Sequence, residues 1–209
     1  MYSSYLLPPH IVSSTNCFYF SLTPIYVALS DSNDRTLSPM FSTDGGEMME
    51  AEYRARWNNG GMWLQGSGTY NGSGSLNSLG AAGSTQAQTY GHLFGSGRFA
   101  LEDDWRSGFD LQLVSNNAYL KYYDLSLLDR LVNDLFIEKD SGRSRLRITS
   151  YYFQGLRAVD NAATIPFILP LIDYSLIPSR NVAGGQFRLN VDSAVASQET
   201  GPDSQRVSA

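Results

Sequence analysis

The chain has 209 residues, a formal net charge of −5 and only 17% charged residues. The acidic balance excludes a nucleic-acid partner, because affinity for phosphate backbones requires concentrated Lys and Arg. The single Cys excludes a disulfide framework and a Cys-based zinc cluster within these residues. The longest apolar run, 165–172, is far shorter than the roughly 20 residues of a membrane-spanning helix.

The first 16 residues differ from the rest of the chain. They hold no Lys or Arg, and their short apolar stretch stops at Pro8-Pro9, so they do not form a secretory signal. We expect 1–16 to be a poorly ordered leader or linker, and 17–209 to form a β-rich region.

Alternation of polar and apolar residues with period two then predicts strands. After expected strands at 18–30 and 35–43, residues 48–57 place charged side chains on one face and apolar or aromatic ones on the other. A four-residue turn at 58–61 would pair Trp57 with Met62, and the following strand, 62–70, alternates in the same way.

The pattern continues to the end of the chain. Strands are expected at 91–101 and 105–113, and a hairpin that turns at 140–143 would pair Glu138 with Arg145. Further strands are expected at 171–177, at 185–197 and from residue 205 onward, which gives ten or eleven in all. No segment strongly predicts a helix; the nearest candidate is 125–132.

Alternation fits two fold classes, a soluble β-sandwich acting as a binding module and a transmembrane β-barrel. Strands of about ten residues, tilted near 40°, would span about 25 Å, the height of an outer-membrane apolar band. Short turns at 58–61, 102–104 and 140–143 alternate with long connections at 71–89, 115–129 and 157–168. Aromatic residues gather near strand ends, as in membrane girdles. These features favour an antiparallel transmembrane barrel in the cell outer membrane.

The charged face is the candidate functional surface. It would either solvate and pair its charges across strands, or line a wet lumen that holds a plug protein and guides anionic sugar and phosphate groups. Its members are Glu50, Glu52, Arg54, Arg56, Arg98, Arg106, Asp110, Arg145, Arg147, Arg188 and Asp192. The two His residues have no Cys or His neighbour at metal spacing, so we predict no metal, no cofactor and no enzymatic activity.

Several stretches, in order along the chain, resemble the LptD family of lipopolysaccharide-assembly outer-membrane proteins, also called organic solvent tolerance proteins. The matching stretches are 24–29, 34–40, 50–54, 91–94, 119–120, 153–156, 169–175 and 184–187. The resemblance identifies 17–209 as the N-terminal part of such a barrel.

The resemblance implies a large barrel that inserts lipopolysaccharide (LPS) into the outer leaflet. In that family, LPS arrives over periplasmic bridge proteins through an N-terminal domain, a plug lipoprotein sits in the barrel, and a lateral gate opens between the first and last strands. Pro24 and Pro39 match the prolines that weaken pairing at the gate. The chain lacks the N-terminal domain, the family's cysteine pair and many strands, so we expect an incomplete barrel that is not functional alone. A small closed porin-like barrel is the other membrane alternative.

Overall fold

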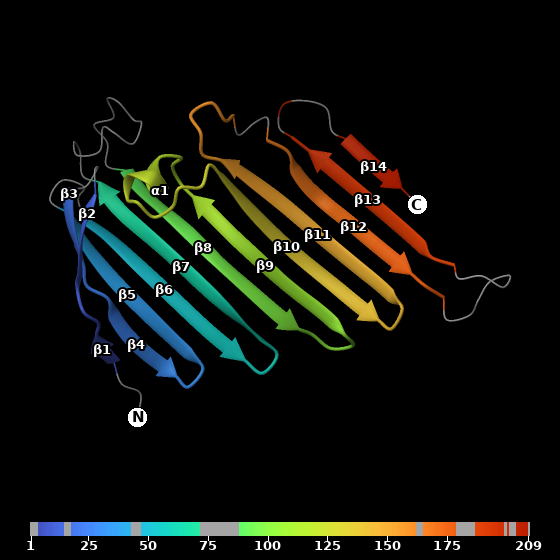
Figure 1. Ribbon diagram of the computed structural model, residues 1–209, viewed down its shortest axis with the longest axis horizontal. Helices are drawn as coiled ribbons and strands as arrows, with labels where there is room; N and C mark the ends of the chain where they lie inside the picture. The colour runs from blue at the N-terminus through green and yellow to red at the C-terminus, as the bar shows by residue number, and fades with distance from the viewer. Residues whose placement is uncertain are drawn as a thin grey trace.

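The computed structural model describes residues 4–14, 18–42, 47–71, 88–161, 165–178, 187–198, 200 and 204–208. They form one antiparallel sheet of 14 strands and one short helix. From β4 onward, neighbouring strands in the sheet are also neighbours in sequence, so the chain meanders from there to the opposite edge (Figure 1). Among the described residues the first and last strands do not pair, and the sheet stays open. The predicted fold class, an antiparallel β-sheet forming an incomplete barrel, is confirmed.

The strands are long in the middle of the sheet and short at both edges. The longest, β8, has 13 residues, and β7, β10 and β11 each have 12. The strands are β1 (Ser4–Leu6), β2 (His10–Ser14), β3 (Phe18–Leu22), β4 (Ile25–Ser30), β5 (Asn33–Ser42), β6 (Glu47–Trp57), β7 (Gly60–Asn71), β8 (Gln88–Ala100), β9 (Trp105–Val114), β10 (Arg130–Ser141), β11 (Ser144–Gly155), β12 (Phe167–Leu176), β13 (Leu189–Ser197) and β14 (Ser204–Ser208).

The N-terminal edge holds one more row of strands than the sequence predicted. Residues 4–14 run antiparallel to 18–30, since β1 pairs with β4 and β2 pairs with β3. Both β3 and β4 pair with β5, so the strand predicted at 18–30 is one row interrupted at Thr23-Pro24. Much of 1–16 therefore lies in the sheet, and its role as a leader or linker stays a prediction.

Two hairpin turns are tighter than predicted. Trp57 lies opposite Gly60 rather than Met62, and Glu138 lies opposite Arg147 rather than Arg145. Two residues instead of four form each turn. In the turn at 142–143, Gly142 has a positive φ of 58°, which a two-residue turn that matches the right-handed twist of paired strands requires. The register moves by two positions in each hairpin, and an even shift keeps the side chains that flank the turns on their predicted faces.

The two ends of the strands differ in their connections. The turns after β4, β6, β8 and β10 lie at one end of the sheet, which we call the short-turn rim (Figure 1). β7, β9 and β11 end at the opposite side of the sheet, the long-loop rim, where the connection after β9 and the described part of the connection after β11 also lie (Figure 1). The connection between β7 and β8, 72–87, is outside the described residues. The predicted alternation of connection lengths is thus present in the described hairpins.

The two faces of the sheet also differ. One face, the apolar face, leaves large side chains in the open: Leu135 is 62% exposed, Phe41 57% and Met49 51%. In a soluble β-sandwich a second sheet would cover such a face. All strands of the described residues belong to one sheet, so no second sheet covers this one. The arrangement suits a sheet whose apolar face contacts lipid.

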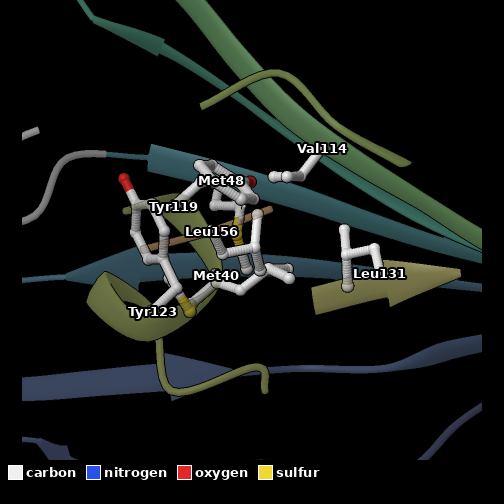
Figure 2. Packing of buried hydrophobic residues seen from close by; sticks show 8 residues of the cluster. Met40, Met48, Val114, Tyr119, Tyr123, Leu131 and Leu156 are labelled. Atoms are coloured by element: carbon white, nitrogen blue, oxygen red, sulfur yellow. Dashed lines mark hydrogen bonds between the residues drawn. The ribbon is translucent and has the colours of Figure 1, made fainter. Parts of the chain in front are cut away.

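The hydrophobic core lies on the opposite face, near the long-loop rim. There the connection between β9 and β10 contains α1 (Tyr119–Tyr122), which lies against β8. Tyr119 and Tyr123 are buried against Met40 and Met48 from β5 and β6 (Figure 2). Leu120 belongs to the same buried cluster. The short helix therefore falls earlier in this connection than the candidate at 125–132. Within the described residues, no helix has the length and apolarity needed to cross a bilayer.

Candidate functional site

The strand register brings ten of the eleven predicted polar residues onto one face, which we call the polar face. Following cross-strand partners from β6 to β13 keeps these side chains on the same side of the sheet. They are Glu50, Glu52, Arg54, Arg56, Arg98, Arg106, Asp110, Arg145, Arg147 and Asp192. Arg188 is exposed and precedes β13. That this face lines a lumen stays a prediction.

An ion-pair network on β9, β10 and β11 occupies the polar face near the short-turn rim. Its centre is the carboxylate of Glu138, a residue only 8% exposed. Arg145 approaches it at 3.0 Å, and Arg106 and Arg147 each at 3.4 Å. Asp140 also pairs with Arg106. The predicted cross-strand pairing of opposite charges is therefore present, with one carboxylate shared by three guanidinium groups.

A second group of arginines surrounds a hollow of about 1050 Å³ at the same rim. Arg54, Arg56 and Arg98 all line it. Arg54 is paired with Asp34 at 2.8 Å and with Glu52 at 3.2 Å. Among the described residues, Arg56 has no carboxylate within ion-pair distance, which leaves its guanidinium available to an anionic group. Guanidinium groups bind phosphate and carboxylate oxygens in a bidentate fork.

A buried hydroxyl cluster attaches α1 to the polar face near the long-loop rim. The Ser67 hydroxyl lies 2.7 Å from Nδ1 of His92 and 2.8 Å from the hydroxyl of Tyr119. The Tyr119 hydroxyl donates to the Met48 sulfur at 3.3 Å, and burial raises the pKa of Tyr119 to about 12. Although Ser67 and His92 resemble a nucleophile and its base, Tyr119 covers both, so the cluster is structural.

Side-chain amides replace part of the sheet ladder where β9 separates from β10. The side-chain amide of Asn133 accepts a hydrogen bond from the backbone N–H of Gln112 and donates one to the carbonyl of the same residue. The Gln154 amide does the same for Val114, and the Gln112 side chain accepts from Val132 N–H. These contacts were not predicted, because period-two alternation contains no signal for an amide that replaces a backbone pair. They hold the sheet together beside the connection that carries α1.

The two predicted gate prolines lie close together at the N-terminal edge. Thr23 N–H donates to the Pro39 carbonyl at 3.3 Å, and Leu7 N–H donates to the Pro24 carbonyl at 2.9 Å. In an antiparallel ladder such opposed residues normally exchange two bonds. Proline has no N–H, so the return bond is missing in both pairs. The row formed by β3 and β4 thus has a weakened pairing on both of its sides.

The described residues contain no group of three or more His, Cys, Asp or Glu placed to hold a metal ion. The polar face instead offers guanidinium groups and carboxylates in alternation, an arrangement that binds and orients charged groups.

A comparison with known protein families bears on this geometry. A family model described as LPS transport system D (LptD) matches residues 88–209, which is more than half of the chain. The matched residues run from β8 to β14 and include the Glu138 network, whereas Pro24 and Pro39 precede them. No curated protein matches the chain.

Proposed function

Because the chain belongs to the LptD family of LPS transport proteins, we propose that it forms part of the wall of an outer-membrane barrel that inserts LPS into the outer leaflet. The family acts in LPS transport and assembly at the outer membrane, and it is not an enzyme family. The observation that carries the proposal is the division of one uncovered sheet into a charged face and an exposed apolar face. A wall between water and lipid requires this division.

In this proposal the polar face lines the lumen. LPS carries phosphate groups, and the arginines around the hollow, Arg54, Arg56 and Arg98, are suited to guide them. Arg188 would add a further guanidinium near the same rim. A plug lipoprotein would contact the rest of the polar face, and periplasmic bridge proteins would deliver LPS through a domain outside the described residues.

The proposed lateral gate lies at the N-terminal edge, where Pro24 and Pro39 each remove a ladder donor. A strand that lacks bonds to its neighbours separates from them at lower free-energy cost. Supporting this role, both missing bonds flank the same strand row, and that row lies next to the edge of the sheet.

Replacing both prolines with Ala in the full-length protein tests the proposal. The two new N–H donors would strengthen the edge pairing by about 1–3 kcal/mol together. We expect LPS at the cell surface to fall several-fold, measured by surface labelling of LPS. Pro166→Ala, at an exposed residue directly before β12, is the matched control and should leave export unchanged. Unchanged export in the double variant would show that Pro24 and Pro39 are ordinary edge prolines.

A further inference from the structure

Two cations interrupt the apolar face. Arg35 on β5 and Lys139 on β10 lie on the side of the sheet that carries Leu37 and Leu135, opposite to the polar face. Each is the third residue from a two-residue turn at the short-turn rim: 31–32 for Arg35 and 142–143 for Lys139. The two side chains therefore lie at matching heights on strands that are five rows apart.

Both cations lie over aromatic rings of directly opposed residues. The Arg35 guanidinium lies 5.5 Å from the ring centre of Tyr53, and the Lys139 ammonium lies 5.4 Å from that of Trp105. Between them, on the same face and rim, the rings of Trp57 and Phe99 lie 6.0 Å apart. We call these six residues the rim belt: Arg35, Tyr53, Trp57, Phe99, Trp105 and Lys139.

The rim belt differs from the polar face in how its charges are balanced. Most polar-face arginines pair with carboxylates, as Arg98 does with Asp110. Within the described residues, no carboxylate lies within ion-pair distance of Arg35 or Lys139. An unpaired cation in hydrocarbon is costly, but near the interface the cost falls to about 0–1 kcal/mol because the long side chain reaches the headgroups. The counterion must then come from outside the chain.

We propose that the rim belt binds the phosphate groups of anionic membrane lipids. Arg35 and Lys139 supply the positive charge, and the rings of Tyr53 and Trp105 hold both side chains at the level of the headgroups. The belt fixes the height of the short-turn rim in the bilayer and gathers anionic lipid along the outer wall. This inference rests on the proposed function, since it requires the apolar face to contact lipid.

The test compares the insertion of the chain into vesicles of pure phosphatidylcholine with insertion into an equal mixture of phosphatidylcholine and phosphatidylglycerol. Anionic lipid should improve partitioning of the unaltered chain, by about fivefold per cation. The double variant Arg35→Gln, Lys139→Gln should lose this preference while it still inserts into phosphatidylcholine. Arg35→Lys with Lys139→Arg conserves both charges and should retain the preference, which separates loss of charge from misfolding.

The control Lys121→Gln with Arg157→Gln removes two charges near the long-loop rim, where both side chains pair with carboxylates, and it should leave the preference for anionic vesicles intact. If this control lost the preference as fully as the Arg35 and Lys139 pair, net charge rather than the rim belt would be responsible. An unaltered chain that inserts equally into both kinds of vesicle would overturn the lipid-binding role of the rim belt but not the proposed function. A chain that inserts into neither would overturn the proposed lipid-facing wall as well.

Discussion

A single side chain, Tyr119, links the short helix α1 to two strands of the polar face. It is fully buried in α1, and its hydroxyl joins Ser67 on β7 to Met48 on β6. Tyr119 and Ser67 are 52 residues apart, so alternation within single strands could not predict their contact. The sequence predicts a long connection at 115–129, but only tertiary packing determines that this connection folds onto the sheet.

The ionisation of Tyr119 gives a prediction with a definite sign. Its pKa is raised to about 12 from an ordinary value near 10, because burial disfavours the phenolate. The folded state holds the proton more tightly than the unfolded state does. The contribution of Tyr119 to stability is therefore fully present below about pH 10, and roughly 2–3 kcal/mol of it is lost as the pH rises through about 12.

Titration of the phenolate ultraviolet absorbance checks this prediction. Tyr119 should ionise near pH 12, and Tyr119→Phe should remove the amplitude of one tyrosine from that late phase. Tyr152→Phe, at a residue that is 51% exposed, is the control and should leave the late phase in place. A late phase of unchanged amplitude in Tyr119→Phe would contradict the assignment.

At the scale of elements, alternation predicted the faces better than it predicted the register. The hairpins after β6 and β10 are each shifted by two positions, and an even shift keeps every side chain on its face. The polar residues therefore gathered as expected, although their direct partners differ. The amides of Asn133 and Gln154 could not be predicted, because their function depends on where β9 and β10 separate in three dimensions.

Leu135 tests the apolar face at mid-strand. It lies in the middle of β10, far from both rims, and is 62% exposed. We expect Leu135→Arg to cost about 2–4 kcal/mol of unfolding free energy in a bilayer, because an Arg at the midplane must leave water. Gln65→Arg, on the polar face of β7, is the matched control and should cost less than about 1 kcal/mol. Equal, near-zero costs in reversible unfolding from vesicles would contradict a lipid-facing β10.

At the scale of the whole molecule, the sequence predicted an antiparallel meander with one charged and one apolar face, and the structure has both. It did not predict the added row of 4–14. Residues 4–14 have no clean alternation, and Pro8-Pro9 interrupts them. They form strands because they pair with 18–30, not because of a pattern in their own sequence. The open edges are a tertiary property, since alternation within each strand is the same in a closed barrel and in a part of one.

The open sheet also predicts how the isolated chain behaves without lipid. In aqueous buffer its apolar face and the outer edge of β14, which has no partner strand among the described residues, should drive self-association. Sedimentation should show large assemblies in buffer and a monomer in detergent micelles. Met49→Glu with Leu135→Glu should reduce assembly if the apolar face drives it, whereas Val207→Lys should do so if the β14 edge does. A stable monomer in plain buffer would instead favour a soluble β-sandwich, because a β-sheet protein stays monomeric in water only when its apolar face is covered.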